Sequence, residues 1–247
     1  AINPVPRDMM RRAIAEAAEA LGGPVDVEIE IGVQDGEKLA ERTLNGRLGI
    51  VGGLSILGTT GVVVPFSCAA WISSIHRGID VARAVGAEHL VGATGHTSEK
   101  ALQAHFGLPD VALIEMGDFV GGMLKYLRQH PVRRITVGGG FAKMTKLGQG
   151  LLDLHSRRGA VDLDWLAGRA LEAGAAQALA QEIRSANAAN EALDLCKAAG
   201  VDIAAAVARE GWRTAAKALE GSGAQLDIAV VDRHGAVLAV EGPHPVS

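Results

Sequence analysis

The sequence predicts an α/β fold with a mostly parallel sheet flanked by helices, an alanine-rich helical segment and a C-terminal β-hairpin. Three observations lead to this prediction. Short apolar runs alternate with stretches of helical periodicity in the middle of the chain. Residues 163–220 are alanine-rich and helical in pattern, and two alternating runs flank a polar turn at residues 232–235. We therefore expect one Rossmann-like domain over residues 1–247, with the helical segment at about 163–220 and the hairpin at about 225–240.

The first part of the chain predicts a helix, a strand and a glycine-rich loop. Apolar residues recur at helical spacing over residues 7–21, and glycines 22 and 23 end that pattern. Residues 25–31 alternate valine and isoleucine with acidic residues, which is typical of a half-buried strand with one polar face. The shorter elements expected here are a helix at 37–44, a strand at 48–51 and the glycine-rich loop 52–61.

From residue 67 onward the sequence predicts βαβ units. A helix at 67–85 comes before three strand–helix pairs, at 89–92 with 98–105, 111–115 with 119–130, and 135–137 with 141–152. Such alternation implies parallel strands joined by right-handed crossovers. Breaks near Gly174 and at Gly200 divide the following segment into two or three helices, and strands at 226–231 and 236–240 form the terminal hairpin.

Composition narrows the possible functions. Apolar residues make up 48% and charged residues 21%, which supports a packed core. A net charge of -4 without a basic block gives no support for a nucleic-acid partner, and no apolar run has the length of a membrane span. Cys68 and Cys196 fall in no CxxC spacing and the histidines in no metal-binding pair, so we expect a reduced, cytoplasmic protein without a metal site.

Glycine-rich loops follow several predicted strands, where open α/β sheets bind ligands. Gly53 and Gly58 have the spacing of a phosphate-binding loop, but Thr59 replaces the lysine, which argues against a nucleoside triphosphate. S-adenosylmethionine carries no phosphate and needs close backbone approach, an apolar slot and a carboxylate for its ribose. Glycines at strand ends also serve as plain turns, so both interpretations stay open. The candidate cofactor-binding residues are Gly52, Gly53, Gly58, Thr59, Thr60, Gly61, Thr94, Gly95 and Glu115.

A second candidate site surrounds residues 138–146. Three glycines at a predicted helix start would expose backbone N–H groups suited to anions. Two lysines follow on one helical side, although such a pair is often just a solvated face. The candidate substrate-binding residues are Gly139, Gly140, Lys143, Lys146 and Arg157. Asp118 and His155 are the candidate acid–base residues, and either side chain could instead interact with a helix end.

These motifs, in order, resemble those of the cobalt-precorrin-5B (C1)-methyltransferase family. The resemblance covers essentially the whole chain, and its specific parts are Leu-Gly-Thr-Thr-Gly at 57–61 and Lys-Met-Thr-Lys-Leu at 143–147. Its other parts are Asn-Pro-Val-Pro-Arg at 3–7, residues 94–100, Gly-Asp-Phe-Val-Gly at 117–121, whose Gly-Asp pair alone is not specific, and His155-Ser156. The resemblance implies methyl transfer from S-adenosylmethionine to ring carbon 1 of a corrinoid substrate, with the glycine loop facing the donor and the basic helix facing the macrocycle.

The sequence departs from the family pattern in three places. The amino-terminal region of the family has no counterpart here, residues 68–70 replace a more acidic stretch, and His96-Thr97 stands where basic residues are common. We therefore expect an amino-terminal fragment or a second copy as a partner. Two alternatives stay open: a nicotinamide- or flavin-dependent oxidoreductase, supported by the glycines at 138–140, and a non-catalytic tetrapyrrole-binding fragment.

Overall fold

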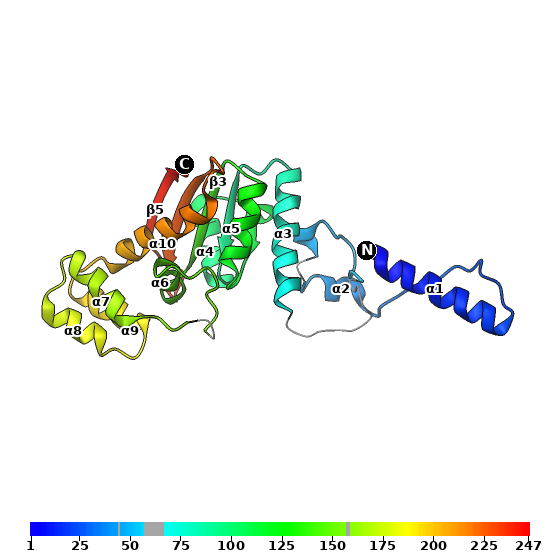
Figure 1. Cartoon of the computed structure of the whole chain (residues 1–247), viewed down its shortest axis with the longest axis horizontal. Helices are drawn as coiled ribbons and strands as arrows, with labels where there is room; N and C mark the ends of the chain where they lie inside the picture. Colours follow the sequence, from blue (N-terminus) through cyan, green and yellow to red (C-terminus); the bar gives the residue numbers. More distant parts are fainter. Residues whose placement is uncertain (44, 57–66, 157–158) are drawn as a thin grey trace. The chain divides into compact units, whose positions relative to one another are not determined.

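The chain divides into two compact units, Ala1–Cys68 and Ala69–Ser247, and each is described by itself. The computed structural model describes residues 1–43, 45–56, 67–156 and 159–247. Figure 1 shows the order of the elements along the chain by colour. The single domain expected over residues 1–247 stays a prediction.

The second unit is built on a five-stranded sheet of order β2-β1-β3-β4-β5. The first four strands run parallel, and β5 returns antiparallel to β4. The α/β class, the parallel sheet and the terminal hairpin are therefore confirmed. The strands are β1 (His89–Ala93), β2 (Leu113–Glu115), β3 (Arg134–Gly140), β4 (Gln225–Val231) and β5 (Val237–Pro245).

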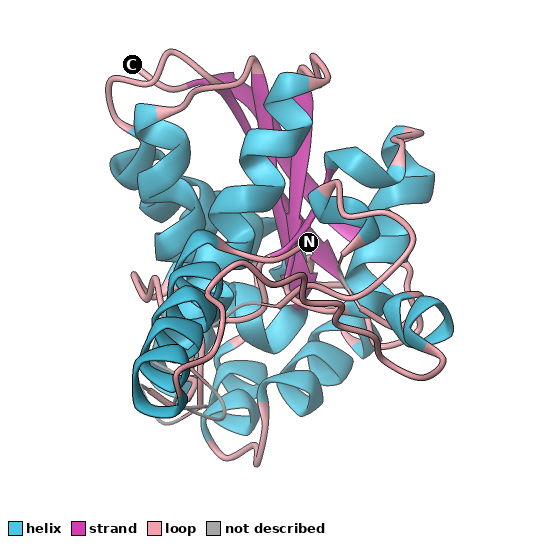
Figure 2. Cartoon of the chain, turned by 90° about the vertical axis from the view of Figure 1, so that its right-hand side faces the viewer, coloured by secondary structure: helices cyan, strands magenta, loops and turns pink. Residues whose placement is uncertain are grey.

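Helices lie on both sides of these strands (Figure 2). One face packs against α4, whereas the larger core on the other face includes residues of α3, α5, α6 and α10. Successive residues of β4 serve the two faces in turn, because Ile228 and Val230 enter the larger core while Ala229 and Val231 pack with Leu102 of α4. These helices are α3 (Cys68–Ala84), α4 (His96–Phe106), α5 (Val120–Gln129), α6 (Phe141–Gly148) and α10 (Ile203–Leu219).

The run of three glycines lies in β3 itself. Gly138 and Gly139 pair with neighbouring strands, and only Gly140 caps the following helix. A Cβ atom at Gly138 would overlap Leu102 of α4, and one at Gly139 would overlap Thr94. The glycines therefore allow close packing against β3, and the prediction that all three open a helix is wrong.

The alanine-rich segment forms four helices rather than two or three. Gly174 (φ 95°) and Gly200 (φ 70°) separate helices as predicted, since a left-handed backbone suits glycine. Asp162 and Asp202 cap α7 and α10 by accepting the backbone N–H groups three residues onward, each at 3.0 Å. The three helices before α10 lie together in Figure 1, and they are α7 (Leu163–Glu172), α8 (Gln177–Arg184) and α9 (Ala189–Ala198).

The first unit contains α1 (Pro4–Leu21) and the short helix α2 (Gly36–Ala40). The predicted helix at 7–21 is confirmed, and it starts earlier because proline is favourable in a first helical turn. Gly22 (φ 71°) ends α1, and its N–H donates to the Ala18 carbonyl at 2.8 Å. The strand predicted at 48–51 is wrong, because a 3-10 helix over Gly46–Leu48 precedes a turn there.

The half-buried strand predicted at residues 25–31 is also wrong. This segment has no regular secondary structure, its valines and isoleucines are exposed, and no described residue pairs with it. The alternation of apolar and acidic residues gives the segment one apolar and one polar face. A β-strand also needs an adjacent strand to hydrogen-bond its backbone N–H and C=O groups. In the described part of this unit, the β-bridge that forms joins Ile2 and Ile56 in parallel.

Candidate functional site

The strand order places a candidate site between the ends of β1 and β3. After β1 the chain crosses to β2 on one side, and after β3 it leads through α6 to α10 toward β4 on the other side. Loops that leave neighbouring parallel strands in opposite directions open a crevice at the carboxyl edge of the sheet. Here the loop after β1 begins at Thr94, whereas β3 ends at Gly140 and leads directly into α6.

A cavity of about 380 Å³ lies at this edge. This volume lies in the range of about 300–1,000 Å³ that is usual for small-molecule sites. The walls come from the starts of α4 and α6, from α9 and from the turn after β4. The lining residues are Thr94, Gly95, His96, Thr97, Ser98, Gly140, Phe141, Ala142, Lys143, Asn190, Asp232 and Arg233.

Two glycines open the cavity to a ligand. Gly95 caps α4 and Gly140 caps α6, both with extended backbone. A Cβ atom built on either would meet no heavy atom within 4 Å, so both positions face open space. Ser98 lies within α4, and its hydroxyl donates to the Gly95 carbonyl at 2.8 Å. A ligand can therefore approach the backbone where the two helices begin.

Lys143 connects the two walls. Its Nζ donates to the Thr94 carbonyl at 3.0 Å and lies 3.1 Å from Asp118 Oδ1. The Thr94 N–H donates in turn to the Gly138 carbonyl at 3.0 Å. Both charged side chains are partly exposed, at 39% for Lys143 and 23% for Asp118. The arrangement offers a carboxylate that can accept a proton beside an ammonium that can bind an anion.

Lys146 is placed differently from Lys143. Its side chain is buried, and Nζ donates to the Leu154 carbonyl at 3.2 Å. The Leu154 N–H donates to the Asp118 carbonyl at 2.9 Å, so this lysine holds the segment after α6 close to the site. The two lysines therefore do not form one solvated face. His155, the next residue, is exposed, and its N–H donates to Asp153 Oδ1 at 3.1 Å.

Glu115 ends β2, on the side of β1 away from β3. Its carbonyl accepts the indole N–H of Trp71 at 3.3 Å. The residue follows a strand of the same parallel set, as predicted, but it is not among those that line the cavity of about 380 Å³. Gly139 is buried behind Thr94 and shapes the wall from within.

Asp232 is a cavity residue that the sequence analysis missed. Its Oδ1 accepts the N–H groups of His234 at 2.8 Å and Ala236 at 2.9 Å. Burial raises the pKa of this carboxyl, but those two N–H groups and nearby Lys197 outweigh burial and hold the pKa below its usual range. Because β4 is parallel to β3, the residue after β4 falls at the same edge, and that rule could have found it.

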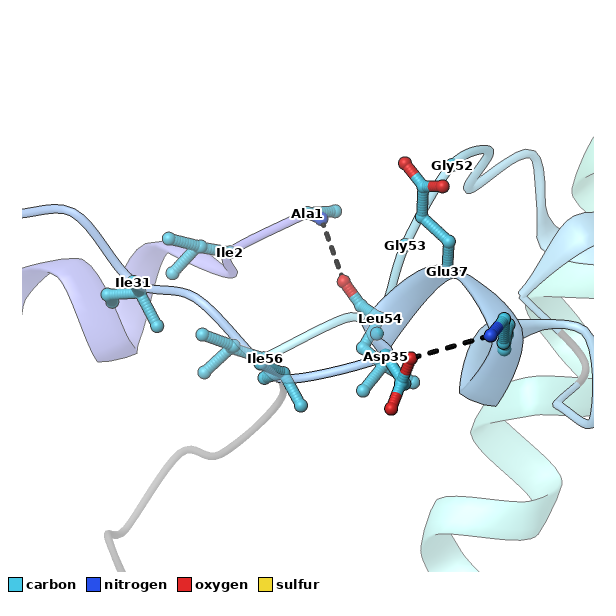
Figure 3. Close-up of a pocket in the computed structure, with 12 residues that line it drawn as sticks. Ala1, Ile2, Ile31, Asp35, Glu37, Gly52, Gly53, Leu54 and Ile56 are labelled. Carbon is cyan, nitrogen blue, oxygen red and sulfur yellow. Dashed lines mark hydrogen bonds and ion pairs between the residues drawn. The ribbon is translucent and has the colours of Figure 1, made fainter.

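Two predicted residues lie in the first unit, where Gly52 and Gly53 line a cavity of about 660 Å³ (Figure 3). Its lining combines apolar side chains with two carboxylates, and comprises Ala1, Ile2, Ile31, Val33, Asp35, Gly36, Glu37, Lys38, Gly52, Gly53, Leu54 and Ile56. Gly58, Thr59, Thr60, Gly61 and Arg157 lie outside the described residues. Their roles stay predictions.

Both cysteines are free thiols, with Cys68 exposed and Cys196 buried. Burial raises the pKa of Cys196 to about 11, so its thiol is protonated at neutral pH. Over the residues that the structure describes, no group of three or more His, Cys, Asp or Glu side chains is arranged to hold a metal ion. Within the same residues, no helix combines the length and apolar character needed to cross a bilayer.

Family models match both ends of the chain. The CbiD model matches residues 1–65, and the model described as CbiD, C-terminal domain, matches residues 153–242. A solved cobalamin biosynthesis protein (cbiD) from Archaeoglobus fulgidus shares 23% identity with a TM-score of 0.26, covering 64% of this chain and 50% of that chain. A TM-score this low supports no structural comparison.

Curated relatives are much more similar in sequence. A protein from Bradyrhizobium sp. named cobalt-precorrin-5B C(1)-methyltransferase is 64% identical over 235 residues, which are 95% of this chain and 62% of the relative. A protein of the same name from Methylorubrum extorquens is 59% identical over 241 residues, which are 98% of this chain and 67% of the relative. The chain thus spans roughly two thirds of the length of these relatives.

Proposed function

Because the chain belongs to the CbiD family, we propose that it acts in cobalamin biosynthesis by transferring a methyl group to ring carbon 1 of cobalt-precorrin-5B. The names of relatives that are 59–64% identical to it support this reaction. The observation that carries the proposal in the structure is the cavity of about 380 Å³ between the ends of β1 and β3. The methyl donor that we propose is S-adenosylmethionine.

The residues of this cavity fit the donor in three respects. Gly95 and Gly140 leave open space next to the backbone, where adenine and ribose can approach. Asp232 supplies a carboxylate that can accept hydrogen bonds from ribose hydroxyls or from the donor's ammonium group. Arg233 and the first N–H groups of α4 and α6 suit the donor's carboxylate. None of these contacts requires the lysine of a phosphate-binding loop.

The donor supplies an already activated methyl group, whose bond to sulfur breaks with the electron pair kept by sulfur as the bond to ring carbon forms. The protein therefore needs mainly to hold the two carbons in line and to exclude water. We assign Asp118 as the group that takes a proton from the macrocycle, because its carboxylate contacts Lys143, which lines the cavity. His155 is the second candidate for this role.

The macrocycle is proposed to lie beside the donor, with a carboxylate on Lys143. Lys146 contributes by position, since its bond to Leu154 holds the segment that carries His155. Gly139 and Gly140 shape the wall between the two ligands. Arg157 stays a predicted contact for another carboxylate of the macrocycle.

Two glycine substitutions test the donor site. Gly95→Val and Gly140→Val place a branched side chain in open space, so the melting temperature should not change. Calorimetric titration with S-adenosylhomocysteine should show affinity lowered at least about tenfold by each. Gly53→Val is the matched control, because it also meets no atom within 4 Å but lines the cavity of the first unit.

The same titrations separate the possible outcomes. Affinity that survives Gly95→Val and Gly140→Val but is lost in Gly53→Val moves the donor to the first unit. Binding of NADP or FMN without S-adenosylhomocysteine would favour an oxidoreductase. Because the chain spans 62% of the Bradyrhizobium relative, methyl transfer should be assayed with and without a polypeptide made from the rest of that relative.

A further inference from the structure

We propose that residues 25–33 form a docking strand, which becomes a β-strand by pairing with a partner strand that carries basic residues. The partner is assigned to the part of the CbiD-family length that this chain does not span. The inference concerns an interaction surface in the first unit and is independent of the proposed methyl transfer. Exposure, free backbone groups, a neighbouring cavity and charge support it.

The docking strand has one apolar face that the chain leaves exposed. Five aliphatic residues recur at every second position, and this spacing puts them on one side of an extended segment. Side chains at such positions in β4 are fully buried. The exposed fractions are 68% for Val25, 47% for Val27, 48% for Ile29, 43% for Ile31 and 53% for Val33.

Its backbone is also free. The N–H and C=O groups of residues 25–32 make no hydrogen bond to any residue that the structure describes. A row of unpaired backbone groups is a template for another strand. This row contains no proline or lysine, which are the residues that usually block such pairing.

The apolar face continues into the cavity of the first unit. Ile31 and Val33 line that cavity together with Ile2 and Ile56, as Figure 3 shows for three of them. The backbones at Ile2 and Ile56 already pair, since the Asn3 N–H donates to the Ile56 carbonyl at 3.1 Å and the Ile56 N–H donates to the Ala1 carbonyl at 2.8 Å. A short ladder and an open apolar cavity therefore adjoin one end of the docking strand.

Among the residues that the structure describes, no other segment offers a matching apolar face. Ten large hydrophobic residues are exposed in the described part of the chain, and eight of them lie in residues 1–68. The remaining two are Trp71, near the start of α3, and Val85, which directly follows its end. Isolated exposed residues of this kind are normal and do not make a docking surface.

Charge argues against a second copy of the chain. The other face of the docking strand carries Asp26, Glu28 and Glu30. Antiparallel pairing of two copies would place carboxylates opposite carboxylates, which destabilises a strand pair. A partner strand with lysine or arginine on that face removes the repulsion, and relatives with more chain than this one can supply it, since this chain covers 62% of the Bradyrhizobium protein.

Hydrogen exchange tests the docking strand directly. The probe is a polypeptide made of those residues of the Bradyrhizobium relative that lie outside the 235 aligned ones. Adding it should slow amide exchange over residues 25–33 at least about tenfold. Val27→Lys with Ile29→Lys should abolish this protection. Val51→Lys, at a position 90% exposed in the same unit, is the matched control and should leave the protection intact.

Other outcomes overturn the proposal in distinguishable ways. Protection in the chain alone at every concentration means that the segment pairs internally, and protection that grows with chain concentration means a second copy. Glu28→Lys should weaken the complex, because it places a lysine opposite the basic residues of the partner strand. A tighter complex would show that the partner strand is not basic. If the added polypeptide does not fold, amide exchange is measured in the intact Bradyrhizobium relative instead. Rapid exchange at its equivalent segment would contradict the proposal.

Discussion

The two units of the chain bury their apolar residues to very different extents. Residues 69–247 hold every large aliphatic or aromatic side chain that is buried in the described structure. In residues 1–68, only Pro6 and Asn45 are buried among the described positions. Both units nevertheless contain well-patterned apolar sequence. The difference lies in whether partners for that pattern are present.

β4 and the docking strand make the comparison concrete. β4 pairs with β3 on one side and β5 on the other, and helices cover both of its faces. The docking strand has a similar alternation but no pairing partner in the described structure. An apolar pattern therefore specifies which residues could be buried, whereas the surrounding chain determines whether they are.

The largest expected effect comes from core truncation. Leu124 is 0% exposed, so Leu124→Ala should lower the free energy of unfolding by about 2–5 kcal/mol. Val27→Ala in the first unit should change it by less than about 0.5 kcal/mol, because Val27 is 47% exposed and lies outside the packed core. Urea unfolding followed by circular dichroism measures both. Similar losses for the two variants would show that the first unit has a packed core after all.

A buried ion pair gives the next largest effect. Arg134 donates to Asp227 at 2.7 and 2.9 Å, and the Asp227 side chain is 0% exposed. Arg134→Leu leaves this carboxylate buried without its charge partner and should lower the free energy of unfolding by about 3 kcal/mol. Adding Asp227→Val removes the unpaired carboxylate and should recover part of the lost unfolding free energy. A single variant as stable as the parent would mean that water reaches Asp227.

His89 makes the second unit sensitive to acid. Burial, and to a lesser extent the charge of Arg134, lowers the pKa of His89 to about 4, against partial opposition from Asp227. Above pH 6.5 the ring is neutral in both states, and below this the unfolded chain takes up the proton first. Stability should therefore fall as the pH drops from 6.5 toward 4, by on the order of 1–2 kcal/mol for a partly buried ring.

His89→Gln is the matched variant for this pH effect. Glutamine does not titrate and can still bond Thr136, whose hydroxyl lies 2.8 Å from His89 Nε2. Between pH 7 and pH 4.5, the urea midpoint of the parent should fall further than that of the variant, because only the parent has a histidine to protonate at this position. Equal losses would remove His89 as the source.

The smallest effect is expected at a surface pair of the first unit. Arg11 lies 2.6 Å from Asp8, and the two side chains are 70% and 60% exposed. Arg11→Ala should change the unfolding free energy by about 0.5 kcal/mol or less, because solvent screens the pair. Measured beside Arg134→Leu, it tests whether burial, rather than short distance, makes an ion pair matter. A loss of similar size at both sites would contradict that view.

Much of the second unit could be predicted from the sequence. Strands β1 and β3 with the helices after them, and strand β4, appear as local patterns that the fold then satisfies. β2 is shorter than predicted, because a 3-10 helix over Asp110–Ala112 occupies its start. The glycines of β3 could not be placed from sequence, since the reason for them is the approach of Leu102 from another element.

The candidate site could be predicted in part. Thr94, Gly95, Gly140 and Lys143 come together because each lies at or just after the end of one of two neighbouring parallel strands. The direction of Lys146 could not be predicted, since it depends on how the segment at Leu154 folds back. Asn190 and Arg233 arrive from the helical segment and the hairpin turn, whose positions only tertiary packing defines.

The bracing of Thr94 has a consequence for how ligands enter the sheet-edge cavity. Thr94 is fixed from behind by Gly138 and from the front by Lys143, so the starts of α4 and α6 are tied to one strand. We therefore expect the two walls to keep the same shape with and without a ligand. A ligand should therefore bind to a preformed site. Little conformational entropy of the protein is lost on binding, so little binding free energy is spent on ordering the chain.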